Sequence, residues 1–314
     1  MRYRPLGNSG LLVSVVGLGC NNFGRRLGLE QTRAVVDAAI DRGVTLLDTA
    51  ESYGGSGRSE ELLGEALAGR RDQVVLATKF GSHGDMGYGP AAGSKGGRAY
   101  IRRAVERSLR RLRTDYIDLY QLHVPDPVTP IEETLTALTE LVQAGLVRYV
   151  GHSNFSAAQI AGAAAAAREL TAVPFISAQN RWSLLERQAE LDVVPTAVQY
   201  GLGVLPYVPL ANGLLTGKIR RGVGPAAGTR LADRADYITD ARLDVVEGLA
   251  EWADQHGRSL LEVAIGGLAA LPGCSSVIAG ATSPQQVEAN AAAGEWEPTE
   301  AQLAEIDKIA PQVR

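Results

Sequence analysis

The stretch Val74-Val75-Leu76-Ala77-Thr78-Lys79 is a short run of aliphatic and β-branched residues that ends on a lysine. Two further runs end in the same way, residues 45–47 at Asp48 and residues 116–122 at His123. Runs of this length, separated by longer stretches of helical periodicity, are typical of parallel βα units. The chain is therefore predicted to contain a parallel sheet whose strands end in polar side chains.

The alternation of strand and helix continues along the whole chain. Strands are predicted at residues 13–18, 45–48, 74–78, 116–122, 147–152, 175–178, 203–208 and 275–279. Helices are predicted at residues 31–42, from 59 onward, and at 98–112, 130–144, 156–169, 188–200, 240–256, 284–292 and 299–309. Eight strands are the number that a closed (β/α)8 TIM barrel of the α/β class requires.

An N-terminal hairpin and extra C-terminal helices complete this prediction. Gly7-Asn8-Ser9-Gly10 lies between two short β-prone runs, a pattern typical of a hairpin turn. The helix at 299–309 follows the last βα unit. No Pro- or Gly-rich linker divides the chain, so residues 1–314 are predicted to form a single barrel domain.

Four polar residues are expected to meet at one face of this barrel. The C-terminal ends of parallel strands share a face, and Asp48, Tyr53, Lys79 and His123 all lie at or just after strand ends. An acid, a phenol, an ammonium group and an imidazole together can move protons to or from a carbonyl. We therefore predict these four as the catalytic residues.

Each of the four has a distinct expected role. Tyr53 supplies a proton to the carbonyl oxygen, although a free phenol has a pKa of about 10. The Lys79 ammonium is expected to lower that pKa, and Asp48 to pair with Lys79. His123 is expected to orient the oxygen. Taken singly, each could instead be structural: a rim aromatic, a helix cap, a surface lysine or a hydrogen-bonded core histidine.

Composition excludes several classes of protein. Hydrophobic residues make up 45% of the 314 residues, charged residues 21%, and the net charge is −4, so no basic field indicates nucleic-acid binding. No run of about 18 apolar residues predicts a membrane span, and residues 1–5 lack the apolar core of a signal peptide. Cys20 and Cys274 are too few for a disulfide framework or a zinc site. A cytoplasmic protein without a metal is expected.

Several further motifs follow strand ends in order along the chain. They are Asp48-Thr49-Ala50-Glu51-Ser52-Tyr53-Gly54, Gly151-His152-Ser153-Asn154-Phe155, Gln179-Asn180, Pro209-Leu210-Ala211-Asn212-Gly213-Leu214-Leu215-Thr216-Gly217-Lys218 and Gly280-Ala281-Thr282-Ser283-Pro284-Gln285-Gln286. With these motifs the chain resembles the aldo-keto reductases along nearly its whole length. It is similar to the branch that contains bacterial reductases and potassium-channel β-subunits.

The resemblance implies a nicotinamide cofactor. Ser153, Asn154 and Gln179 would hold the nicotinamide carboxamide, and Tyr207 would stack on the ring. The other implied cofactor contacts are Pro209, Leu210, Asn212, Leu215, Gly217, Lys218, Arg230, Gly280, Thr282, Gln286 and Asn290.

NADPH rather than NADH is the expected hydride donor. Lys218 would meet the pyrophosphate, Arg230 loosely matches the family's phosphate-binding arginine, and a helix begins near Thr282, where an anion is favoured. The chain also departs from the family: Gln286 stands where other branches have a cation, and Ala289 where a Glu usually contacts the adenine. These departures leave NADH open.

The resemblance implies reduction of an aldehyde or ketone, a small-molecule carbonyl substrate. Phe23, Phe80, Met86 and Tyr88 are the candidates for the wall of the substrate pocket, and the long segments 80–97 and 211–237 are expected at its mouth. Three alternatives stay open: a sugar or polyol dehydrogenase of the same fold working oxidatively, a cofactor-sensing binding module, and a barrel enzyme of unrelated chemistry. Substrate and oligomeric state are not predicted.

Overall fold

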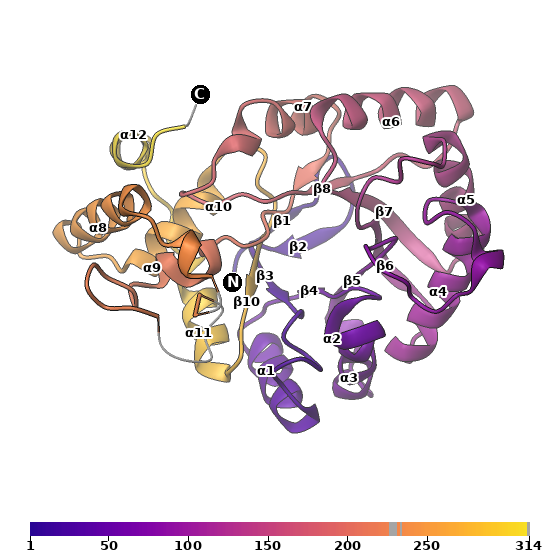
Figure 1. Cartoon of the computed structure of the whole chain (residues 1–314), viewed down its shortest axis with the longest axis horizontal. Coiled ribbons are helices and arrows are strands. Elements are labelled where there is room, and N and C mark those ends of the chain that lie inside the picture. Colours follow the sequence, from indigo (N-terminus) through magenta and orange to yellow (C-terminus); the bar gives the residue numbers. More distant parts are fainter. Residues whose placement is uncertain (226–230, 233, 313–314) are drawn as a thin grey trace.

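A curled sheet of eight parallel strands forms the centre of the molecule, and helices surround it (Figure 1). The structure is a computed structural model that describes residues 1–225, 231–232 and 234–312. In these residues the strands are β3 (Val16–Gly19), β4 (Leu46–Asp48), β5 (Val75–Phe80), β6 (Ile117–Leu122), β7 (Val147–Ser153), β8 (Ser177–Gln179), β9 (Gly203–Val204) and β10 (Val277–Gly280). Their order in the sheet is β10-β3-β4-β5-β6-β7-β8-β9.

The two ends of this sheet meet. Parallel bridges join Val204 to Cys274 and Tyr207 to Ile278. The Ile278 amide donates a hydrogen bond of 2.9 Å to the Pro206 carbonyl. The predicted (β/α)8 barrel is therefore confirmed.

The N-terminal hairpin consists of antiparallel strands β1 (Tyr3–Pro5) and β2 (Leu12–Ser14). Leu6, Leu11 and Val13 pack against inward-facing barrel residues such as Leu46 and Leu119. The hairpin and its turn therefore cover the N-terminal end of the barrel. The prediction of a single strand over residues 13–18 is therefore wrong, because these residues are divided between β2 and β3. The side chain of Ser14 causes the break: its hydroxyl donates to the Val16 carbonyl and accepts from the Thr45 amide.

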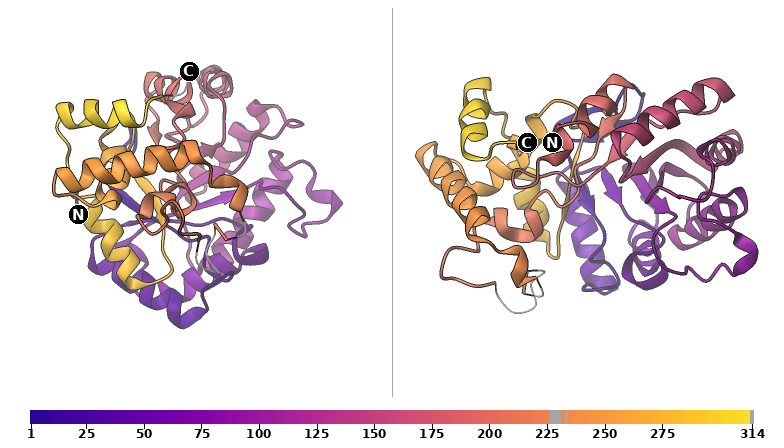
Figure 2. Two further views of the ribbon diagram at one scale, coloured as in Figure 1. Left: turned by 60° about the vertical axis from the view of Figure 1, so that its left-hand side comes forward. Right: turned by 45° about the horizontal axis from the view of Figure 1, so that its top comes forward.

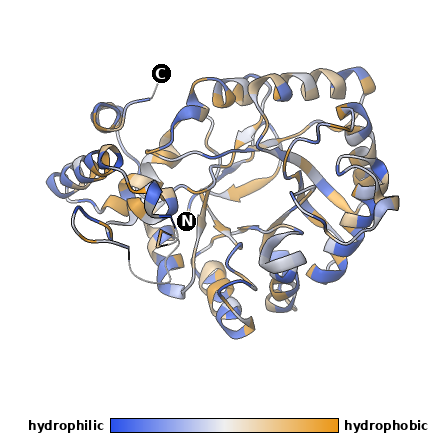
Figure 3. Cartoon of the chain, in the orientation of Figure 1, coloured by the Kyte–Doolittle hydropathy of each residue, from blue (hydrophilic) through white to orange (hydrophobic). Residues whose placement is uncertain are grey.

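Helices cover the outside of the barrel. The long ones are α1 (Leu29–Asp41), α3 (Arg58–Ala66), α4 (Arg98–Leu112), α5 (Ile131–Gln143), α6 (Ala157–Leu170), α7 (Val193–Gln199), α8 (Asp240–Gln255), α11 (Pro284–Ala293) and α12 (Glu300–Ile309). They carry hydrophilic and hydrophobic residues in alternation, while the central strands are mostly hydrophobic (Figure 3). No helix in the described part of the chain is long and apolar enough to cross a membrane.

One helical segment is absent from the prediction. Residues 260–270 form α9 (Leu260–Glu262), a π-helical turn (Val263–Gly267) and α10 (Leu268–Ala270). Figure 2 shows this part of the molecule beside α8 and α12, which lie together at one side of the barrel. A second hydrophobic cluster, which includes Leu214, Trp252 and Trp296, joins these helices to the barrel.

The long connections contain only short helical turns. These are α2 (Tyr53–Ser56), η1 (Arg71–Gln73), η2 (Pro90–Ala92), η3 (Gln188–Glu190), η4 (Ala211–Thr216) and η5 (Ala235–Tyr237). α2 immediately follows β4, and η4 follows β9, so both lie at the C-terminal face of the barrel.

Candidate active site

The four predicted catalytic residues come together at the C-terminal ends of neighbouring strands. Asp48 ends β4, Lys79 is the penultimate residue of β5, and His123 directly follows β6. Tyr53 begins α2, five residues after Asp48. The Tyr53 and His123 rings meet edge to face with 5.7 Å between their centres.

Lys79 lies beneath this group and is fully buried. Its Nζ donates to Asp48 Oδ2 at 2.6 Å and to the Thr49 carbonyl at 2.9 Å. It also lies 3.5 Å from the Tyr53 hydroxyl oxygen. Because an ammonium group has three donors, this arrangement uses all of them and points one at the phenol.

Two amide side chains hold the other oxygen of Asp48. Gln179 Nε2 donates to Asp48 Oδ1 at 3.0 Å, and Gln121 Nε2 donates to the same oxygen at 3.2 Å. Gln121 was not predicted as a site residue. Gln121 lies on β6, two residues before His123, which directly follows that strand. This spacing is the signal that identifies it, because alternate residues of an extended chain point to the same side.

The pKa of Tyr53 corrects one expectation. Burial raises the pKa of this phenol above its ordinary value, and the negative charge of Asp48 adds to the increase. The Lys79 ammonium lowers the pKa, as expected, but it does not overcome burial. Tyr53 is therefore held in its protonated form at neutral pH.

The charges of Lys79 and His123 follow from the same surroundings. Burial lowers the pKa of Lys79, but Asp48 and Tyr53 together hold it above its ordinary value. Burial and the nearby ammonium lower the pKa of His123 to about 3. His123 is thus a neutral imidazole, with one N–H donor and one acceptor nitrogen. Its buried Nδ1 has no hydrogen-bond partner in the described part of the chain.

A cleft of about 790 Å³ opens above these residues. Asp48, Tyr53 and His123 line one part of it. The structure also brings most of the residues implied as cofactor contacts to this cleft: Ser153, Asn154, Gln179, Tyr207, Pro209, Leu210, Asn212, Lys218, Gly280, Thr282, Gln286 and Asn290. One continuous cleft therefore joins the four-residue cluster to the segments after β9 and β10.

The polar groups next to the cluster are fixed by one another. Tyr207 donates from its hydroxyl to Asn154 Oδ1 at 2.8 Å, and Asn154 Nδ2 donates to the His123 carbonyl at 2.9 Å. The Ser153 hydroxyl donates to the Gln179 carbonyl at 2.8 Å. Asn154 has a φ of 63°, a left-handed conformation that asparagine tolerates better than most residues. These contacts pre-orient the side chains before a ligand arrives.

The segment after Tyr207 has an unusual backbone. Val208, Ala211 and Asn212 have φ values of 57°, 47° and 59°. A positive φ is costly for a β-branched residue such as valine, and such strain collects at ligand-binding sites. Val208 and Asn212 both line the cleft.

The start of α11 forms another wall of the cleft. Ser283 caps the helix by accepting from the Gln286 amide. Gln286 Oε1 in turn accepts from the backbone amide of Thr282 at 2.8 Å and from its hydroxyl at 3.1 Å. The positive end of this helix dipole faces a cleft that Lys218 also lines.

Several predicted contacts lie elsewhere. Leu215 is fully buried, and neither it nor Gly217 lines the cleft. Arg230 lies outside the described residues.

The structure places the predicted substrate-wall residues away from this cleft. Phe23 and Phe80 are fully buried in the main hydrophobic core, where Phe80 stacks on Tyr120. Met86 and Tyr88 pack against the same core from outside the barrel, and the Tyr88 hydroxyl donates to buried Glu51. None of the four lines the cleft.

Other residues of the cleft were missed. Asn21, Asn22 and Arg26 come from the connection between β3 and α1, and Leu261 comes from α9. The consecutive asparagines, three and four residues after the strand predicted at 13–18, are a signal similar to Asp48 and His123. Leu261 carries no such signal, because the sequence does not show that α9 folds back to the cleft.

The chain is similar to known proteins along nearly its whole length. The model of the aldo/keto reductase family matches residues 15–311. A probable voltage-gated potassium channel subunit beta of Arabidopsis thaliana is 36% identical over 303 residues, which cover 92% of this chain and 90% of that protein. The uncharacterized oxidoreductase YrpG of Bacillus subtilis is 38% identical over 91% of this chain and 89% of its own length. The L-glyceraldehyde 3-phosphate reductase of Escherichia coli K12 is 35% identical over 92% of this chain and 86% of its own length.

Proposed function

This chain belongs to the aldo/keto reductase family of oxidoreductases, and we propose that it reduces an aldehyde or ketone to the alcohol with NADPH. The observation that carries the proposal is the contact of Lys79 with both Asp48 and Tyr53 at the edge of a large cleft. We also propose that it acts in the cytoplasm on a small carbonyl compound.

The half-buried phenol of Tyr53 is suited to the proton step. The reduced nicotinamide, when bound, supplies the hydride that the carbonyl carbon accepts. As the carbon–oxygen π bond opens, the oxygen takes the proton of the Tyr53 hydroxyl. The raised pKa of Tyr53 keeps this proton available at neutral pH. The Lys79 ammonium, 3.5 Å away, stabilises the tyrosinate that forms.

His123 positions the substrate rather than protonating it. An imidazole with a pKa of about 3 stays neutral during turnover. Its N–H can donate to the carbonyl oxygen while that oxygen faces Tyr53, since the two rings are in edge-to-face contact. Asp48 keeps Lys79 in place and is itself held by Gln121 and Gln179.

The cleft has the groups that a nicotinamide dinucleotide needs. Ser153, Asn154 and Gln179 present amide and hydroxyl groups to a carboxamide, and Tyr207 offers a ring face fixed by its hydrogen bond to Asn154. Farther along, Lys218 and the start of α11 favour phosphate groups. We propose NADPH because its 2′-phosphate adds negative charge that Arg230 would meet, while Lys218 would meet the pyrophosphate that both cofactors share.

A panel of aldehydes, ketones and sugars assayed with NADPH and NADH tests this function. We expect saturable reduction and a higher kcat/KM with NADPH. Arg230→Ala should lower kcat/KM with NADPH more than with NADH, and Lys218→Ala should lower it with both. Lys308→Ala, at an exposed lysine on α12, should change neither value. A preference of the wild type for NADH would contradict the cofactor proposal.

A cofactor-sensing binding module is the second candidate, because probable potassium channel β-subunits of Arabidopsis thaliana and rice are 36% and 38% identical to the chain. Tight NADPH binding without turnover of any carbonyl or alcohol would favour it. Turnover only in the oxidative direction with sugars or polyols would instead identify a dehydrogenase of the same fold.

A further inference from the structure

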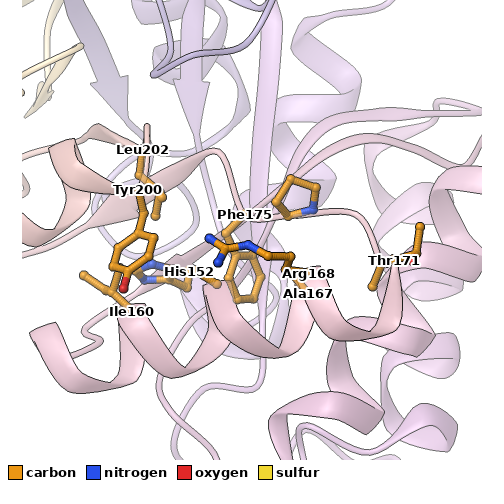
Figure 4. A pocket seen from close by; sticks show the side chains of 11 residues that line it. His152, Ile160, Ala167, Arg168, Thr171, Phe175, Tyr200 and Leu202 are labelled. Carbon is orange, nitrogen blue, oxygen red and sulfur yellow. The ribbon is translucent and has the colours of Figure 1, made fainter.

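A second pocket lies outside the barrel wall, between α6 and the segments around Phe175 and Leu202 (Figure 4). Its volume is about 370 Å³, at the lower end of the range of about 300–1,000 Å³ that is usual for small-molecule sites. It shares no lining residue with the cleft that holds Tyr53. The proposed reductase chemistry makes no use of it.

His152 is the most informative residue of this pocket. It is fully buried, and neither ring nitrogen has a hydrogen-bond partner in the described residues. The ring stacks on Phe155 with 4.3 Å between ring centres and meets Phe175 edge to face at 5.1 Å. Burial lowers the pKa of His152 to about 3, so the ring is neutral. Its two nitrogens, enclosed at the buried end of the pocket, therefore hold an unused donor and an unused acceptor, which is rare for a buried side chain.

Arg168 supplies a positive charge to the same pocket. Its guanidinium makes no ion pair with the described residues, and no carboxylate lines the pocket. Figure 4 shows the Arg168 side chain extending toward His152 and Tyr200. Ile160, Phe175 and Leu202 provide apolar walls around these groups.

We propose that this pocket binds a small organic carboxylate whose body is apolar and carries one hydrogen-bonding group. The guanidinium of Arg168 pairs with the carboxylate, since its fork of N–H donors matches two carboxylate oxygens. The hydrogen-bonding group of the ligand satisfies His152 at the buried end. The aliphatic and aromatic walls contact the apolar body. A cation would meet Arg168 without a counter-charge, and a hydrocarbon would leave His152 unsatisfied.

Titration with 4-hydroxybenzoate tests the proposal directly. The protein is labelled with ¹⁵N-histidine, and the His152 ring signals are assigned by comparison with His152→Gln. We expect saturable binding by calorimetry and a matching shift of the His152 nitrogens. The uncharged analogue 4-hydroxybenzamide should bind at least about tenfold more weakly, because it cannot pair with Arg168.

Three variants connect this binding to the pocket. Arg168→Gln should lower the affinity for 4-hydroxybenzoate at least about tenfold. Ala164→Trp, which fills the pocket from α6, should abolish its binding. Arg102→Gln on α4 is the matched control, since Arg102 is also exposed, and it should bind as the wild type does. Far-UV circular dichroism and NADPH affinity report whether each variant is folded.

Two results would overturn the proposal. One is the absence of saturable binding of 4-hydroxybenzoate to the folded wild type. The other is binding that persists unchanged in folded Arg168→Gln and Ala164→Trp, because the ligand would then occupy a different place. Since the readouts do not depend on turnover, failure here leaves the proposed reductase function untouched.

Discussion

The pKa of Tyr53 is set by a competition between burial and one neighbouring charge. The sequence correctly predicted the neighbour, because Lys79 and Asp48 end adjacent strands and must lie close together. It did not predict the net direction, since the depth at which the phenol is buried depends on the packing of the whole barrel face. Burial prevails, and the phenol stays protonated.

Removing the lysine charge gives the first prediction. In Lys79→Met the Tyr53 phenol loses the positive charge that lowers its pKa, while burial and Asp48 still raise that pKa. Alcohol oxidation requires Tyr53 to accept a proton, so its pH profile should shift to higher pH and its rate at neutral pH should fall. The pH dependence of kcat/KM for alcohol oxidation measures this shift.

Lys308→Met provides the control, because Lys308 is exposed on α12 and distant in sequence from the cluster. A Lys79→Met enzyme with the profile and rate of the wild type would mean that Lys79 and Tyr53 are not coupled.

The elements of the fold differ in how well the sequence predicts them. The strands that become β6 and β7 are predicted within one residue at each end, and the strand that becomes β5 within two, because each is a short β-prone run that ends at a polar residue. The helix pieces over 260–270 were missed. They contain Gly266, where a Cβ would lie 2.8 Å from the Ala293 carbonyl oxygen. The close approach of the Ala293 backbone leaves no room for a side chain at position 266. Local helix propensity does not reveal such a contact between distant segments.

Helical glycines give the second prediction. Gly64 of α3 faces α4, and a Cβ there would lie 2.4 Å from the Arg111 carbonyl oxygen. Gly162 of α6 has open space at the same position. Gly64→Ala should therefore destabilise the protein, whereas Gly162→Ala should stabilise it by about 0.5–1 kcal/mol through helix propensity.

Urea unfolding of both variants measures the difference. The two substitutions are chemically identical, so each serves as the control for the other. Equal changes of the same sign in the free energy of unfolding would show that the close contact of α3 with the end of α4 does not exclude a side chain at position 64.

At the scale of the whole molecule, the site was predictable where strand ends determine it. Asp48, Lys79, His123 and Ser153 lie where parallel strands finish, and a barrel brings those ends together. The pocket wall was not predictable, because the side to which Phe80 points at the end of β5, and the path of the connection that carries Tyr88, depend on tertiary packing. Phe80 stacks on Tyr120 in the core, and Tyr88 packs against Tyr100 of α4 and donates to buried Glu51.

Buried neutral histidine gives a prediction about stability. His152 has a pKa of about 3 when folded, against about 6.5 for an unfolded histidine. Between these values the unfolded chain binds more protons, so the free energy of unfolding should decrease as the pH falls below about 6.5. His152 alone should contribute a loss on the order of 3 kcal/mol by about pH 4.

Urea unfolding at several pH values tests this for the wild type and His152→Gln. The variant should lose less stability on acidification, because it lacks the group that the unfolded state protonates. His83→Gln, at an exposed histidine, is the control. Parallel curves for the wild type and His152→Gln would show that His152 is not kept neutral by folding.

The central claim is that Tyr53 donates the proton in carbonyl reduction, and Tyr53→Phe tests it most directly. Phenylalanine keeps the ring beside His123 and removes only the hydroxyl that lies 3.5 Å from Lys79 Nζ. Single-turnover reduction of an aldehyde by NADPH-loaded enzyme should slow by about 10²–10⁴-fold. NADPH affinity, measured by fluorescence titration, should stay close to that of the wild type. A Tyr53→Phe enzyme that reduces the aldehyde within a few-fold of the wild-type rate would contradict the account.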